Sequence, residues 1–155
     1  FKFFNINLII YMNKVIKKIL EDNPVLVGLS VNAANYNFSC KFAKILKQNN
    51  PNLKICMGGP NSDNDEIWNL EIKNYIDFAV IGEAELIMPE IVKRLKNDQS
   101  IEDMSGVLVI DSKHKFKPWH PEKELGKIVP PTFLEFDLEK YKDSYGEGWT
   151  RAKDF

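Results

Sequence analysis

The segment 25–61 limits most strongly how this chain can fold, because two short apolar runs in it flank an amphipathic helix. Residues 25–31 (VLVGLSV) form a nearly continuous apolar run, which is typical of a strand buried on both faces of a parallel sheet. Apolar side chains then recur at helical spacing over 37–48, and Pro51 follows where a helix must have ended. Residues 53–57 form the second apolar run. The segment predicts a parallel strand–helix–strand unit.

The rest of the chain repeats this alternation. The expected elements are a helix over 12–20 that reaches back into the first ten residues, a short helix over 67–72, strands over 76–81 and 105–110, a helix from Glu83 to about Leu95 with Pro89 in its first turns, and a hairpin turn over 111–115. The predicted class is therefore α/β: a Rossmann-like or flavodoxin-like parallel sheet flanked by helices, with a C-terminal hairpin and an extended tail. We expect a Rossmann-like domain over 1–112, and a hairpin and linker over 113–155 that leads to a domain outside this chain.

Composition argues against several functional classes. The formal net charge of −1 gives no basis for binding nucleic acid or an anionic membrane, and the apolar opening 1–12 is too short to span a bilayer. Cys40 and Cys56 lie in different predicted elements and belong to no Cys-x-x-Cys or His/Cys cluster. We therefore predict buried free thiols in a cytoplasmic protein, no metal site and no catalytic residue in this chain.

The candidate binding residues follow the predicted strands. Parallel strands joined by helices place these loops at the same edge of the sheet, where open α/β folds bind ligands. Small residues permit close approach of a ligand, and amides and carboxylates supply directional hydrogen bonds. The candidates are Ser30, Asn32, Ala33, Asn35 and Tyr36 after the first strand of the unit, Gly58, Gly59, Pro60 and Asn61 after the second, and Gly82, Glu83 and Glu85 after the third.

Each of these signals also has a purely structural interpretation. Asn35 is a good cap for the helix that follows it, and a glycine pair after a strand often makes only a tight turn. Glu83 and Glu85 favour the positive end of a helix dipole. The chain has no Gly-x-Gly-x-x-Gly motif and no Walker lysine loop, which argues against a dinucleotide or nucleoside triphosphate as ligand.

Read together, the motifs resemble the cobalamin-binding domain of cobalamin-dependent radical S-adenosylmethionine enzymes. The pieces that match, in order, are Val27-Gly-Leu-Ser30, Asn35-Tyr36, Gly58-Gly-Pro60, Ile81-Gly-Glu-Ala-Glu85, Pro130-Pro131 and Phe136-Asp-Leu-Glu-Lys-Tyr141. The resemblance implies a Rossmann-like domain that holds cobalamin at the loops named above. It also implies a radical S-adenosylmethionine barrel in the same parent chain, which would bind S-adenosylmethionine and a 4Fe-4S cluster, with methyl transfer as one candidate reaction.

The chain departs from this family in three respects. It has no Cys-x-x-x-Cys-x-x-Cys cluster, so it cannot perform radical chemistry alone, and the strand and loop that precede the first helix in relatives are missing, so we expect a fragment. It has no Asp-x-His-x-x-Gly motif, and His114 and His120 fall in the hairpin and tail. The resemblance therefore implies a corrinoid whose cobalt takes no histidine from this chain. Two alternatives stay open: a non-catalytic, degenerate Rossmann-like module for protein contacts or sensing, and a flavodoxin-like flavin or nucleotide binder.

Overall fold

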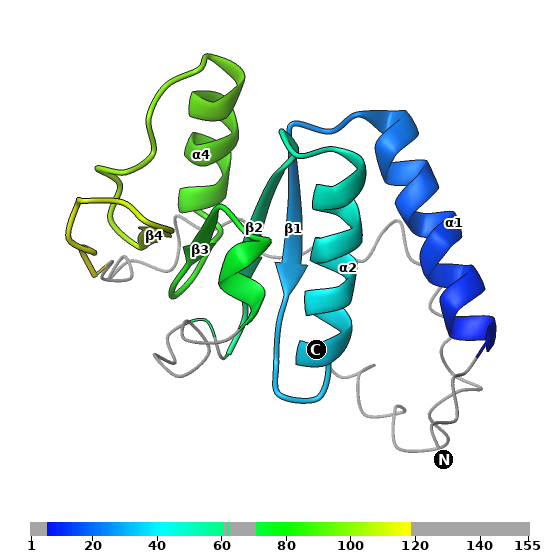
Figure 1. The fold of residues 1–155 in the computed structure, drawn as a ribbon. Helices are drawn as coiled ribbons and strands as arrows, with labels where there is room; N and C mark the ends of the chain where they lie inside the picture. Colours follow the sequence, from blue (N-terminus) through cyan, green and yellow to red (C-terminus); the bar gives the residue numbers. More distant parts are fainter. Residues whose placement is uncertain (1–5, 61, 63–70, 119–155) are drawn as a thin grey trace, which may run out of the picture. The chain divides into compact units, whose positions relative to one another are not determined.

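The computed structural model describes residues 6–60, 62 and 71–118, which all belong to one compact unit of the chain. Helices and strands alternate along this part of the sequence (Figure 1). They are α1 (Ile6–Asp22), β1 (Leu26–Ser30), α2 (Tyr36–Asn49), β2 (Lys54–Gly58), the 3-10 helix η1 (Glu71–Asn74), β3 (Phe78–Val80), α4 (Ile87–Lys96) and β4 (Val107–Val109). The predicted α/β class is confirmed.

The strands form one sheet in the order β1-β2-β3-β4, in which β1, β2 and β3 are parallel. Cys56 in β2 is the partner of Gly28 in β1 and of Phe78 in β3. Parallel pairing brings the carboxyl ends of these three strands to one edge, which we call the carboxyl edge. The opposite edge, where they begin, is the amino edge.

The fourth strand differs from the parallel arrangement that the sequence suggested, because β4 is antiparallel to β3. The reason lies in the connection after α4, which returns to the carboxyl edge before β4 begins. There the backbone N–H of Ile81 donates to the carbonyl of Gly106 at 2.9 Å, and at the other end of the strand Ile110 N donates to Asp77 O at 2.9 Å. A connection of this kind is long enough to reverse the direction of entry, and apolar runs alone do not reveal it.

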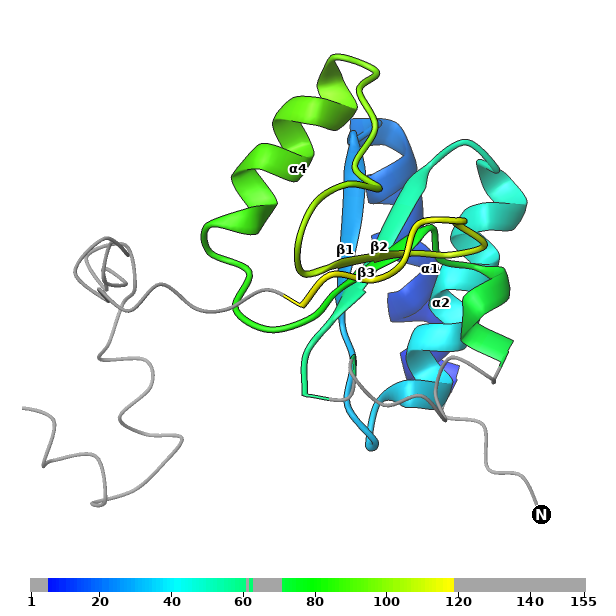
Figure 2. The ribbon, with the colours of Figure 1, turned by 90° about the vertical axis from the view of Figure 1, so that its left-hand side faces the viewer.

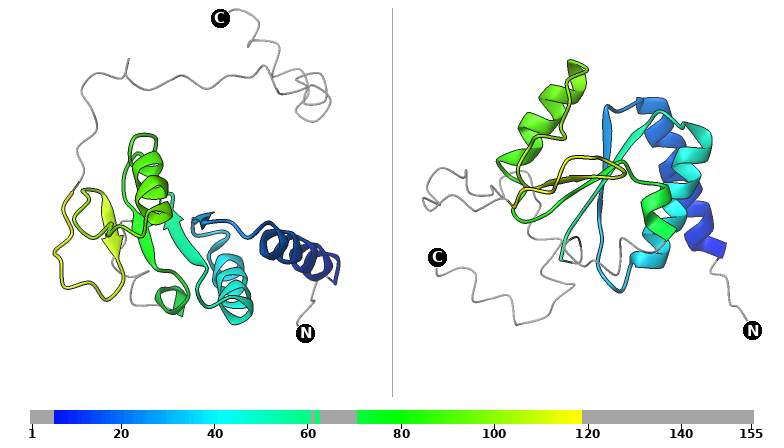
Figure 3. Two further views of the ribbon diagram at one scale, coloured as in Figure 1. Left: turned by 90° about the horizontal axis from the view of Figure 1, so that it is seen from above. Right: turned by 60° about the vertical axis from the view of Figure 1, so that its left-hand side comes forward.

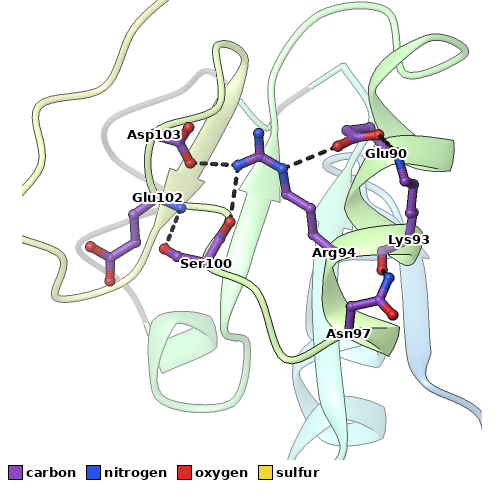
Figure 4. Close-up of polar contacts among 7 residues, drawn as sticks. All are labelled: Glu90, Lys93, Arg94, Asn97, Ser100, Glu102 and Asp103. Atoms are coloured by element: carbon purple, nitrogen blue, oxygen red, sulfur yellow. Dashed lines mark hydrogen bonds and ion pairs between the residues drawn. The ribbon is translucent and has the colours of Figure 1, made fainter.

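Arg94 fixes this connection to α4 (Figure 4). Its guanidinium donates to Glu90 within the helix at 3.2 Å, to the Ser100 carbonyl at 3.0 Å and to the Asp103 carboxylate at 2.6 Å. Hydrogen bonds from Arg94 hold the pKa values of the Glu90 and Asp103 carboxyls below their usual range. One side chain thereby joins the helix to the segment that leads into β4.

Helices cover the two faces of the sheet unequally (Figures 1, 2 and 3). Helices α1 and α2 lie on one face, where alternate strand residues such as Ile55 and Met57 are fully buried. Helix α4 lies on the other face, where Phe78 packs with Ile91 and Val107. Together these two layers form the core on either side of β2 and β3.

Strand β1 is less buried than predicted. Gly28 and Ser30 are exposed and the other residues of β1 are half-buried, whereas Ile55–Met57 of β2 is fully buried. Among the described residues β1 pairs only with β2, and α4 packs over β2 and β3 rather than over Gly28. The expectation of burial on both faces is therefore wrong for β1, because an apolar run does not distinguish an edge strand from a central one.

Other boundaries refine the predictions. Helix α1 does reach back into the first ten residues, and the helix expected from Glu83 begins instead at Ile87, with Pro89 in its first turn. The chain turns at Asp111, and Gly106 N donates to Lys117 O at 2.8 Å, but residues 116–118 do not form a strand. Residues 67–70 of the expected helix over 67–72 and the tail 119–155 lie outside the described residues, and residues 71–72 belong to η1. No helix in the described part is long and apolar enough to cross a membrane.

Candidate functional site

The loop between β1 and α2 is held by the side chains of Asn32 and Asn35. The Asn32 side-chain oxygen accepts hydrogen bonds from the backbone N–H groups of Ala34 and Asn35, at 2.9 and 3.0 Å. The Asn35 side chain accepts from Asn32 N at 2.8 Å through Oδ1 and donates to Ser30 O at 2.9 Å through Nδ2. Asparagine favours such local bonds to the backbone, and here they fold the loop onto itself. Asn35 precedes α2 but its side chain makes no capping bond to the helix.

The turn after β2 packs directly against this loop. Val31 N donates to Gly58 O at 2.8 Å, which continues the β1–β2 pairing beyond the strands. Gly59 has a φ of +107°, and a Cβ atom at this position would lie 2.8 Å from Val31 O. Only glycine fits so close to another backbone in this conformation. Gly59 is therefore needed for the contact between the two loops as well as for the turn, whereas a Cβ at Gly58 would make only an ordinary 3.8 Å contact.

The loop after β3 completes the carboxyl edge. A hollow of about 300 Å³ lies between the second and third loops and is lined by Gly59, Pro60, Ser62, Ile81, Gly82 and Glu83. Gly82 has a φ of +93°, so a side chain there would strain the backbone as well as fill the hollow. Four of the predicted residues thus meet at one place, as the parallel topology requires.

The predicted binding residues differ in their solvent exposure. Asn35, Tyr36 and Gly58 are half-buried, and Asn61 lies outside the described residues. Those exposed are Ser30, Asn32, Ala33, Gly59, Pro60, Gly82, Glu83 and Glu85. Glu83 and Glu85 stand before the first turn of α4, whose opening bonds from Ile87 N and Met88 N go to Ala84 O. Exposure leaves these groups available, and their contact with a ligand stays a prediction.

Tyr36 lies apart from the other residues of its loop. Its ring packs against the core beneath α2, and its hydroxyl is buried without a hydrogen-bond partner among the described residues. Burial, together with the neighbouring Cys40, raises the pKa of Tyr36 to about 12. Tyr36 is the first residue of α2 and is not among the residues that line the hollow beside Gly59 and Gly82.

Sequence reasoning missed Ser62 and Ile81 as parts of this edge. The Ser62 hydroxyl donates to Gly59 O at 2.8 Å and its backbone N–H donates to the same oxygen at 3.0 Å. A serine three residues after the glycine is a recognisable turn signal. Ile81 had been assigned to the strand, and nothing in the sequence marks its position beside the hollow.

Among the described residues, Cys40, Cys56 and His114 do not line the hollow at the carboxyl edge. Cys40 and Cys56 are buried free thiols, as predicted, and burial raises the pKa of Cys56 to about 11. His114 lies 3.4 Å from Glu102, which borders a hollow at the amino edge together with Val25 and Asp77. Within the described residues no group of three or more His, Cys, Asp or Glu side chains is arranged to hold a metal ion.

Comparison with known proteins agrees with this geometry. Residues 2–92 match the family model described as the B12 binding domain. Over 131 residues the chain is 28% identical to a protein of Pyrococcus horikoshii that is described as an uncharacterized methyltransferase. The match covers 83% of this chain but only 28% of that relative.

Proposed function

This chain belongs to the B12-binding domain family, and we propose that the carboxyl edge of its sheet is where it holds a corrinoid cofactor, cobalamin. The observation that supports this most directly is the meeting of three strand ends whose loops are short of side-chain bulk. Gly59 and Gly82 expose backbone there, and Ser30, Asn32 and Glu83 add exposed polar groups. The site is at the edge where open α/β sheets bind ligands.

The residues present fit such a ligand. A corrinoid has a broad ring with amide side chains on its rim, so a protein that holds it needs room for the ring and hydrogen-bonding groups for the amides. The hollow beside Gly82 has about 300 Å³ and continues onto exposed loops, so it seats part of the ligand and leaves the remainder over the open edge. Hydroxyl, amide and carboxylate groups line this edge, and each can pair with an amide.

We also propose that the cobalt takes no histidine from this chain. His114 lies beside Glu102, which borders the hollow at the amino edge, whereas Ser30 and Gly59 lie at the carboxyl edge. His120 lies outside the described residues. The chain's contribution is then to bind and orient the cofactor through its rim rather than to ligate the metal.

The enzyme that contains this domain can be specified further. The Pyrococcus horikoshii relative is described as a methyltransferase, and this chain spans about a quarter of its length. We propose a radical S-adenosylmethionine methyltransferase whose barrel, with its S-adenosylmethionine and 4Fe-4S cluster, follows this domain. Bound cobalamin would supply group-carrier chemistry, and the domain would present it to the neighbouring barrel.

The test is retention of hydroxocobalamin by the purified chain after desalting, followed by the visible spectrum of the protein fraction. Ser30→Trp places bulk at the carboxyl end of β1, and Val25→Trp places the same bulk at its amino end. We expect corrin absorption with the wild type and Val25→Trp, at least tenfold weaker retention with Ser30→Trp, and a spectrum without a histidine ligand. A colourless wild-type fraction would favour the degenerate module, and a flavin spectrum on purification would favour the flavodoxin-like alternative.

A further inference from the structure

The two asparagines of the β1–α2 loop use their side chains differently. Both polar atoms of Asn35 are engaged within the loop, at 2.8 Å from Asn32 N and 2.9 Å from Ser30 O, and the residue is half-buried. These two bonds fix the orientation of the Asn35 amide, which keeps one N–H and one lone pair for other partners. Asn35 is also less exposed than Asn32, which makes it the weaker candidate for direct contact with a ligand.

In Asn32 the side-chain oxygen is engaged within the loop, and the Nδ2 donor is not. Two backbone N–H groups donate to its side-chain atom, so that atom must be the oxygen, and the Nδ2 group points elsewhere. Asn32 Nδ2 makes no hydrogen bond to the described residues, and Asn32 is exposed at the carboxyl edge. Because two hydrogen bonds fix the Asn32 oxygen, the Nδ2 donor is already oriented before a ligand arrives.

We propose, resting on the corrinoid function above, that Asn35 is a positioning residue and that Asn32 presents its Nδ2 donor to an acceptor group of the cofactor, such as an amide carbonyl. Asn35 ties Asn32 N and Ser30 O together, and Val31 N is tied to Gly58 O at 2.8 Å. The loop is therefore preformed on both sides of Asn32. Preforming a loop strengthens binding because less conformational freedom is lost when the ligand arrives.

Three variants separate the two roles. Asn35→Ala removes both bonds, so we expect cobalamin to bind about tenfold more weakly, since each net hydrogen bond contributes a factor of several. Asn35→Asp keeps the acceptor for Asn32 N and loses the donor to Ser30 O, so its affinity should be intermediate. Asn32→Asp keeps the acceptor for both N–H groups and replaces only the Nδ2 donor, so affinity should fall about tenfold in an intact loop. Asn37→Ala, an exposed asparagine in the first turn of α2, is the matched control.

Amide hydrogen exchange without cofactor reports the loop, and titration with hydroxocobalamin reports binding. We expect the Asn32 amide to exchange at least tenfold faster in Asn35→Ala, and to stay protected in Asn35→Asp and Asn32→Asp, with thermal midpoints near that of the wild type. Unchanged affinity in Asn35→Ala despite faster exchange, or unchanged affinity in Asn32→Asp, would overturn the assignment. A wild type that binds no cobalamin would instead refute the proposed function, while the exchange rates still decide whether Asn35 holds the loop.

Discussion

The two edges of the sheet are held together by different forces. At the carboxyl edge two loops meet by backbone contact, as between Gly59 and Val31, and the β1–α2 loop is held within itself by neutral amides such as Asn35. At the amino edge the Asp77 carboxylate accepts from Lys47 Nζ at 2.8 Å, Lys54 Nζ at 3.4 Å and Ile55 N at 2.8 Å.

This difference suggests that stability and binding are separable in this domain. In the Lys47–Asp77 ion pair both side chains are only about one fifth exposed, whereas Lys54 is about half exposed, and both pairs stabilise the start of β2 and β3 without reaching the opposite edge. The carboxyl edge keeps exposed polar groups that are suited to an amide-rich, largely uncharged ligand surface. Changes at the amino edge should therefore lower stability alone, and changes at the carboxyl edge should weaken cofactor binding as well as stability.

The largest expected effect follows from Gly59→Ala. Its Cβ would lie 2.8 Å from Val31 O in a backbone with φ of +107°, so the variant should lose about 3 kcal/mol of unfolding free energy. Cobalamin retention should be lost as well, because the two loops separate. Gly28→Ala is the control, since its Cβ would make an ordinary 3.7 Å contact with Cys56 Sγ. Urea denaturation and desalting with cobalamin measure both effects; equal behaviour of the two variants would contradict the close-packing argument.

A smaller loss of stability, with binding preserved, is expected from Asp77→Ala. The change leaves the N–H of fully buried Ile55 without its acceptor and removes the carboxylate partner of Lys47, whose ammonium keeps only carbonyl acceptors such as Leu53 O at 2.8 Å; the cost should be about 2 kcal/mol. Asp22→Ala is the control, because it removes the Lys18–Asp22 ion pair, which has the same 2.8 Å length. The side chains of Lys18 and Asp22 are 71% and 55% exposed, so this change should cost less than about 0.5 kcal/mol. Cobalamin affinity of folded Asp77→Ala should equal that of the wild type. Weakened binding in this variant would show that the two edges are coupled.

The smallest effect, and one that depends on pH, is expected from Arg94→Met. Hydrogen bonds from Arg94 lower the pKa values of Glu90 and Asp103 in the folded state, so the unfolded state binds more protons as the pH falls. Their stabilisation is fully present above the ordinary carboxyl pKa values and is lost as the pH falls through the lowered folded values. At pH 7 the variant should melt roughly 3 °C below the wild type. Below about pH 4 the difference in melting temperature should narrow to what the bond from Arg94 to the neutral Ser100 carbonyl contributes; a constant difference down to pH 2 would refute the assignment.

Much of the fold could be predicted because local signals agree with it. The apolar run before Gly58-Gly59, the helical spacing in α2 and the stop at Pro51 each depend on a few neighbouring residues. The placement of three loops on one edge follows from parallel pairing and needs no further information. The sequence also singled out Gly59 and Gly82, whose positive φ angles are a local requirement.

The site was predicted less completely because the roles of its side chains depend on partners. The sequence identifies Asn32 and Asn35 as polar loop residues but does not reveal which amide atoms are satisfied within the loop. It predicts Tyr36 as a loop residue, whereas Tyr36 is the first residue of α2 and its hydroxyl is buried. Ser62 and Ile81 join the hollow only because the turn after β2 and the end of β3 lie next to each other.

By itself the sequence determined the succession of strands and helices, the parallel unit of β1 to β3 and the glycine-rich carboxyl edge. These features follow from periodicity, propensity and backbone sterics, which act between residues close in the chain. Only the tertiary structure decided that β4 runs antiparallel, that β1 is half-exposed at the sheet edge, and that Arg94 and Asp77 each join separate elements. Those outcomes depend on which groups meet across long stretches of chain, where burial and hydrogen-bond partners are fixed by packing.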